Sequence, residues 1–97
     1  MAYYVLLINW TDQGVRDVKT LAERISSAEQ VFQTRHGAKL VQIFMTMGRY
    51  DTVSIWEAPN DESMTKAVLA LGAQGNVRTE TLRAYGRDEL SALLADL

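Results

Sequence analysis

The sequence predicts an α+β domain in which helices cover one face of a four-stranded antiparallel sheet. The chain has 97 residues, which suits a single domain over residues 1–97. A hydrophobic share of 47% is typical of a folded protein rather than a disordered one. Strand-like and helix-like apolar patterns follow one another in the order strand, helix, strand, strand, helix, strand, helix.

The first third of the chain contains one strand and one long helix. Residues 3–10 form a continuous apolar run with β-branched and aromatic members, which predicts a central strand buried on both faces. Residues 11–14 have turn chemistry, and the side chain of Thr11 or Asp12 is suited to cap the following helix. Gly37 is placed for a left-handed cap at the end of that helix. The apolar stripe expected to face the core is Val15, Val18, Ala22, Ile25 and Phe32.

A hairpin follows the first helix. Residues 39–46 alternate between two faces and predict a second strand, and residues 52–57 predict a third. Gly48 lies between them and is suited to the positive φ angle that a hairpin connection requires. The second and third strands are therefore expected to be antiparallel neighbours.

The remaining residues predict a helix, a strand and a final helix. Pro59 ends the third strand, and Asn60 or Asp61 is placed to cap a helix that closes near Gly72. Residues 76–85 predict the fourth strand. The last helix carries Leu90, Leu93, Leu94 and Leu97. This order of elements is that of a ferredoxin-like βαββαβ fold with an extra C-terminal helix.

Strand alternation predicts which side chains face the helices. The expected helix-facing set is Val41, Ile43, Met45, Val53, Ile55, Leu82 and Ala84. The expected open-face set is Leu40, Gln42, Phe44, Ser54, Trp56, Thr79, Thr81, Arg83 and Tyr85. A shift of one residue in the fourth strand would instead expose Arg78 and Glu80 there.

The open face is expected to need a partner. Four strands present roughly 300 Å² of sheet, close to the largest apolar patch that a monomer usually exposes. At about 25 cal/mol per Å², this area contributes roughly 8 kcal/mol, against an association cost of about 4–15 kcal/mol. We therefore expect a face-to-face homodimer, or a higher homo-oligomer, to which the C-terminal leucine helix adds apolar surface.

Composition excludes several kinds of chemistry. The absence of cysteine rules out disulfides and thiolate metal sites, and His36 is the only histidine. We expect no metal and no cofactor. A net charge of −2 without a basic stripe predicts no nucleic-acid partner. The start of the chain resembles neither a signal peptide nor a membrane span, so the sequence predicts a cytoplasmic protein with no membrane association.

Three polar stretches are candidates for function. Residues 10–14 (WTDQG) combine a strand end with a helix start, which suits either capping or anion binding. Residues 48–51 (GRYD) end in Tyr50 and Asp51, which could share a proton with a substrate or only shape the hairpin. Residues 75–81 (GNVRTET) contain an arginine that could clamp a carboxylate or pair with Glu80.

Together with residues 57–62 (EAPNDE), these stretches resemble the GYD domain family of small bacterial and archaeal proteins. Their order and spacing carry the resemblance over nearly the whole chain. It implies a dimeric α/β-barrel assembly related to the ferredoxin-like fold. It implies no defined reaction, because the family is functionally uncharacterised.

The sequence therefore favours a homo-oligomeric module that binds a small organic, possibly anionic, ligand. The expected ligand-binding residues are Trp10, Tyr50, Trp56, Asn76, Arg78, Glu80 and Thr81. One alternative is a cofactor-independent enzyme, monooxygenase-like or isomerase-like, in which Tyr50 or Asp51 transfers a proton. Another alternative is a purely structural assembly module without a ligand.

Overall fold

The computed structural model describes residues 1–97 and contains four strands, four α-helices and one 3₁₀ turn. The strands are β1 (Ala2–Trp10), β2 (Lys39–Met45), β3 (Thr52–Ala58) and β4 (Val77–Ala84). The helices are α1 (Asp12–Arg16), α2 (Leu21–His36), α3 (Asp61–Ala73) and α4 (Arg87–Ala95), with the 3₁₀ turn η1 at Val18–Thr20. The predicted ferredoxin-like order with an extra C-terminal helix is confirmed.

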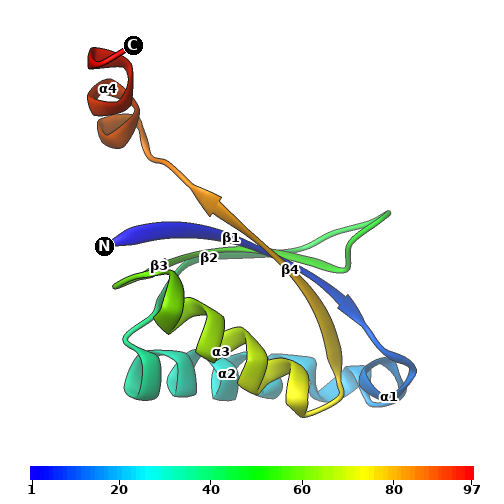
Figure 1. The fold of residues 1–97 in the computed structure, drawn as a ribbon. Helices are drawn as coiled ribbons and strands as arrows, with labels where there is room; N and C mark the ends of the chain where they lie inside the picture. Colours follow the sequence, from blue (N-terminus) through cyan, green and yellow to red (C-terminus); the bar gives the residue numbers. More distant parts are fainter.

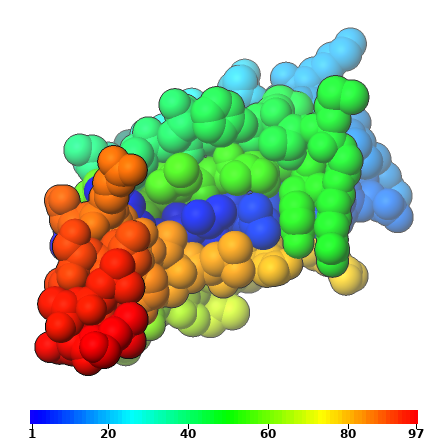
Figure 2. Space-filling view, turned by 90° about the horizontal axis from the view of Figure 1, so that it is seen from above, coloured from blue at the N-terminus to red at the C-terminus, as the bar shows by residue number.

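The sheet has the strand order β2-β3-β1-β4, and all neighbours are antiparallel. Helices α2 and α3 lie against one face, and no helix covers the opposite face (Figure 1). Helix α4 projects beyond the sheet on this uncovered side. Viewed from above, the uncovered face lies between α4 at one end and the β2–β3 connection at the other (Figure 2).

The core lies between the sheet and the two covering helices. Tyr4, Leu6 and Ile8 of β1 point into it, as does Trp56 of β3. The Trp56 ring packs on Phe32 of α2 with their centroids 4.5 Å apart. The Trp56 indole N–H donates to the Ser54 hydroxyl at 2.8 Å, so that a polar group buried in the core keeps a hydrogen bond.

The predicted face assignment is wrong for every residue named in β3 and β4, and the alternative one-residue shift in β4 is the arrangement observed. In the sheet, Leu6 of β1 pairs with Ser54 of β3 and with Thr81 of β4, and Tyr4 pairs with Trp56 and with Arg83. Paired residues point to the same face of a sheet, so these side chains all lie on the helix-facing side. Thr79 also lies on that side, opposite Ile8. Val53, Ile55, Leu82 and Ala84 therefore lie on the uncovered face, together with Val5 and Leu7 of β1.

The predicted faces of β2 are correct except at its start. A β-bulge between Leu40 and Gln42 shifts the register, so Leu40 faces the helices although Gln42 and Phe44 face outward. Ile43 and Met45 lie on the helix side as predicted. Simple alternation fails here because a bulge inserts one extra residue.

The predicted long first helix is divided. Thr11 caps α1 by accepting from the Gly14 amide at 3.1 Å, as predicted. The backbone of Asp17 (φ −116°, ψ 46°) then leaves the helical region, and η1 separates α1 from α2. Val15 and Val18 consequently remain 47% and 40% exposed rather than joining the core stripe.

Three local predictions are confirmed. Gly37 caps α2 in the left-handed conformation (φ 66°), and Gly48 has φ 104° in the β2–β3 connection. The Asn60 side chain caps α3 by accepting from the Ser63 amide at 2.8 Å.

None of the helices has both the length and the apolar character that a membrane-spanning helix requires.

Candidate functional site

The three polar stretches meet at one end of the sheet, where β1 ends. The Trp10 backbone N–H donates to the Asp51 carboxylate at 2.8 Å. The Thr11 hydroxyl donates to the Gly75 carbonyl at 2.6 Å, and the Thr11 amide donates to the Asn76 carbonyl at 3.1 Å. These hydrogen bonds hold together segments that are far apart in the sequence. In each bond at least one of the two groups belongs to the backbone.

Helix α1 packs tightly on the connection between α3 and β4. A Cβ atom on Gly14 would lie 1.9 Å from the Asn76 carbonyl oxygen, so this contact requires glycine. The Gln13 side-chain amide adds hydrogen bonds to the Asn76 side chain at 3.0 Å and the Gln74 carbonyl at 3.1 Å. The glycine of the WTDQG stretch thus permits a close approach of two backbone segments.

The β2–β3 connection reaches across the uncovered face to β4. Tyr50 donates its hydroxyl proton to Glu80 at 2.9 Å. This hydrogen bond raises the pKa of the Tyr50 phenol above its ordinary value, with smaller contributions from desolvation and from the Glu80 charge. Glu80 therefore bonds to Tyr50, and it forms no ion pair with Arg78.

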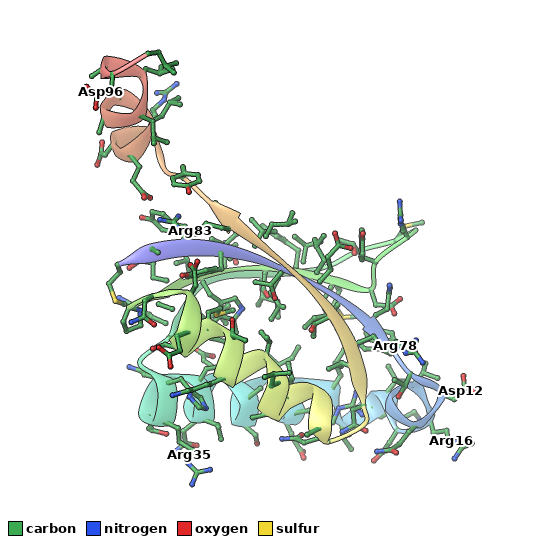
Figure 3. The ribbon with its side chains drawn as sticks, viewed as in Figure 1. Asp12, Arg16, Arg35, Arg78, Arg83 and Asp96 are labelled. Carbon is green, nitrogen blue, oxygen red and sulfur yellow. The ribbon has the colours of Figure 1, made fainter.

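The residues predicted to bind a ligand fall into separate places. Trp10, Trp56 and Asn76 line a cavity between the sheet and α2, whose volume is about 70 Å³. Arg78 lies at the α1 end of the molecule with Asp12 and Arg16 (Figure 3) and lines a shallow outer depression that also contains Trp10. Tyr50 and Glu80 lie on the opposite face of the sheet. Thr81 is exposed on the helix-facing side of the edge strand β4.

The cavity contains a charged residue that sequence reasoning did not select. Arg24 of α2 lines it and donates through Nη1 to the Gly14 carbonyl at 2.9 Å. Its Nη2 atom is buried and has no hydrogen-bond partner. The sequence feature that could have identified Arg24 is its position three residues after Leu21 and four before Ala28. This spacing places a charge on the core-facing side of the helix.

A groove between α2 and α3 adjoins this cavity. It has a volume of about 340 Å³, and Arg24, Phe32 and Leu71 line both spaces. The cavity lining is predominantly apolar, with 11 hydrophobic residues among 16. Such a space suits a small organic molecule better than a hydrated ion.

Comparison with known proteins identifies the family. The GYD domain model matches residues 4–94. The chain belongs to the GYD domain family. The matched range includes all four polar stretches that carry the resemblance. It also includes the strands between them.

A curated relative of this GYD domain protein comes from Thermus thermophilus and is described as "Glutamine synthetase and cystathionine beta-lyase binding protein". The two chains are 31% identical over 94 residues, which cover 97% of this chain and 99% of the relative. The relationship therefore extends over the whole domain.

The GYD domain shows no group of three or more histidine, cysteine or acidic side chains that could hold a metal ion. Asp51 uses one carboxylate oxygen to accept from the Trp10 backbone, and the Tyr50 phenol is held by Glu80. The GRYD stretch of this family member therefore contributes hydrogen bonds between strands. The cavity is lined mainly by apolar side chains and by Arg24, whose guanidinium group has no counterion.

Proposed function

We propose that this GYD domain protein is a homo-oligomeric module that binds a small organic ligand. The cavity between the sheet and α2 is the observation that carries the ligand part of the proposal. Well-packed cores contain few voids, so an apolar space of this kind beside the core offers contact surface for a ligand. Trp10, Trp56 and Asn76, which line it, would provide stacking surface and a polar contact.

The uncovered face of the sheet supports self-association. Its apolar side chains include Phe44 and Leu82, which are 56% and 45% exposed. Half-buried Val5, Val53 and Ile55 lie among them. A second copy placed face to face would remove this surface from water, at about 25 cal/mol per Å² of apolar area.

Helix α4 extends this surface. Leu90, Leu93 and Leu94 are 46–54% exposed, and Leu97 is 97% exposed. Leu90, Leu93 and Leu94 lie three and four residues apart and form one helical stripe that this chain leaves uncovered, and Leu97 follows the end of the helix. Arg83 of β4 contacts the start of α4 through a 3.0 Å ion pair with Glu89. A second copy would cover both the sheet face and this stripe.

The oligomer is tested with Phe44→Lys. A lysine buried against a second copy would have to be desolvated, so we expect the variant to be monomeric at micromolar concentration while the wild type is dimeric or larger. Leu69→Lys is the control, because Leu69 is 67% exposed on the helix α3 side. Sedimentation velocity reports the mass. A monomeric wild type would remove self-association from the proposal.

The ligand part is tested by thermal unfolding with a broad panel of small metabolites, together with mass analysis of compounds that copurify. We expect at least one compound to raise the melting temperature of the wild type. Ala28→Leu would fill part of the cavity and should abolish that rise. No rise with any compound would leave the structural assembly role as the better description.

A second function, protein binding, is favoured by the Thermus relative. Its described partners are glutamine synthetase and cystathionine beta-lyase, and its alignment covers nearly all of both chains. The exposed leucines of α4 provide surface for such contacts. Calorimetric titration of this protein into each purified enzyme tests the role, and no heat of binding with either enzyme would reject both as partners.

The hydrogen bonds of Tyr50 and Asp51 support binding over the enzymatic alternative. A base or nucleophile at this position needs a free carboxylate oxygen or an ionised phenol. The raised pKa of Tyr50 opposes ionisation of its phenol, and one of the two Asp51 carboxylate oxygens is already bonded to the Trp10 backbone. Arg78 remains a candidate for contacting an anionic ligand at the outer depression. Unchanged ligand affinity of an Arg78→Ala variant would exclude Arg78 from ligand binding.

A further inference from the structure

Arg24 is a cation without a counterion. Its Nη1 donates to the Gly14 carbonyl at 2.9 Å and makes a longer contact of 3.5 Å to the Asp17 carbonyl. The ion pairs of this chain involve only Lys66 and Arg83 as cations. The buried Nη2 has lost its contact with water and gains no partner in return.

The residues around Arg24 indicate what kind of molecule could neutralise it. Arg24 is the only charged residue that lines the cavity, so no carboxylate of this chain competes for its guanidinium group there. The cavity lining also includes Phe32 and Trp56, which pack on each other. A complementary molecule would therefore have one anionic end and one apolar end.

We propose that the cavity binds a short aliphatic carboxylate whose carboxylate oxygen accepts from the Arg24 guanidinium group. This inference rests on the proposed ligand-binding function and specifies its ligand class. A carboxylate matches a guanidinium donor in geometry and charge. An inorganic oxyanion would leave most of its oxygens facing apolar walls, and a neutral chain would leave the guanidinium group without a counterion.

The size of the cavity limits the chain length. One water-sized group needs roughly 10–15 Å³ of such space, so about 70 Å³ holds roughly five to seven non-hydrogen atoms. Butanoate and pentanoate fit this size. The groove between α2 and α3 adjoins the cavity at Arg24 and Leu71.

Calorimetric titration of the full-length protein with pentanoate, pentanamide and inorganic phosphate tests the proposal. We expect the wild type to bind pentanoate at least about tenfold more tightly than pentanamide, because the amide lacks the charge that Arg24 recognises. Phosphate should not compete with pentanoate. This comparison needs no variant and therefore holds even if substitution of Arg24 impairs folding.

Arg24→Gln supplies the second arm, with Arg35→Gln as the matched control. Arg35 lies on the same helix and points into solvent (Figure 3). We expect Arg24→Gln to weaken pentanoate binding by about 10-fold to 100-fold and Arg35→Gln to leave it unchanged. Melting curves of both variants confirm folding.

The outcomes separate this inference from the function on which it rests. Equal binding of pentanoate and pentanamide, or unchanged pentanoate binding by folded Arg24→Gln, would overturn the carboxylate assignment while ligand binding stands. Failure of pentanoate to bind, when another compound in the metabolite panel stabilises the protein, would also overturn only the ligand class. Failure of every compound would remove the ligand-binding function itself.

Discussion

The carboxylate of Asp51 accepts a hydrogen bond from the backbone N–H of Trp10 at 2.8 Å, and the Asp51 amide donates to the Ile8 carbonyl at 2.8 Å. One residue of the β2–β3 connection therefore fixes the end of the central strand through both its side chain and its backbone. Because Trp10 lines the cavity, this contact also sets one wall of the candidate ligand site.

Removing the Asp51 carboxylate should destabilise the fold. We expect Asp51→Ala to lower the free energy of unfolding by about 1–3 kcal/mol, because the Trp10 amide loses its partner, whereas Asp51→Asn keeps an acceptor and should cost less than about 1 kcal/mol. Urea denaturation measures both. Asp96→Ala, near the exposed C-terminus, is the control and should stay within about 0.5 kcal/mol of the wild type. Equal losses for Asp51→Ala and Asp51→Asn would contradict this role.

A methyl group at Gly14 should be poorly tolerated. Its Cβ would meet the Asn76 carbonyl oxygen at 1.9 Å, and the two backbones would have to separate. We expect Gly14→Ala to cost about 1–3 kcal/mol or more. Gly72→Ala is the matched control: nothing lies within 4 Å of its Cβ position in α3, and alanine should stabilise the helix by about 0.5–1 kcal/mol. A Gly14→Ala protein as stable as the wild type would show that the contact can relax.

Tyr4 should make the fold sensitive to alkaline pH. Burial, followed by a 2.6 Å hydrogen bond to Asp61, raises the pKa of Tyr4 to about 12. The folded pKa exceeds the unfolded value near 10, so the contribution of Tyr4 is complete below about pH 10 and is lost as the pH rises through about 12. Tyr4→Phe removes that dependence.

Urea denaturation between pH 8 and pH 12 compares the wild type with Tyr4→Phe. The variant should be less stable near neutral pH by about 1.5–3 kcal/mol, the usual value for a hydrogen bond to a charged group, and this difference should shrink as the pH approaches about 12. Exposed Tyr85 serves as the control through Tyr85→Phe. A constant difference between wild type and Tyr4→Phe would exclude Tyr4 as the source.

Acid should loosen helix α4. The side-chain hydrogen bond from Arg83, followed by that from the Gly86 amide, lowers the pKa of Glu89 below its ordinary value. The contribution of Glu89 is therefore present above the ordinary glutamate pKa and is lost as the pH falls through the lowered folded value. The protection factors of α4 amides against hydrogen exchange, taken relative to the intrinsic rate at each pH, should fall there in the wild type. Glu89→Gln should show low protection already at neutral pH, whereas Glu62→Gln, in an exposed i,i+4 pair with Lys66, should match the wild type.

Much of the fold was predictable because local periodicity depends only on neighbouring residues. The central position of β1, the caps at Thr11 and Asn60, and the positive φ angles at Gly37 and Gly48 were predicted correctly. The predicted burial of β1 on both faces was wrong, because Val5 and Leu7 are only half-buried on the uncovered face. The break at Asp17 was missed, because Val15 and Val18 continue a helical pattern that the chain does not follow.

The candidate site was less predictable. The three polar stretches do converge, but the hydrogen bonds from Trp10 to Asp51 and from Thr11 and Gln13 to Asn76 do not by themselves distinguish a structural cluster from a binding site. Arg24 was missed because an arginine at a core-facing position resembles a surface residue until the packing around it is known.

The sequence alone determined the order and type of the elements and the family, since these follow from periodicity, turn chemistry and ordered motifs. Tertiary structure decided which face of each strand is buried. In β3 both faces carry apolar side chains, and hydrophobicity favoured Val53 and Ile55 for the core. The helices instead cover Ser54 and Trp56, because Trp56 fills the space against Phe32 and the small Ser54 satisfies its indole N–H. That choice left Val53 and Ile55 on the uncovered face and placed Trp56 in the wall of the cavity beside Arg24.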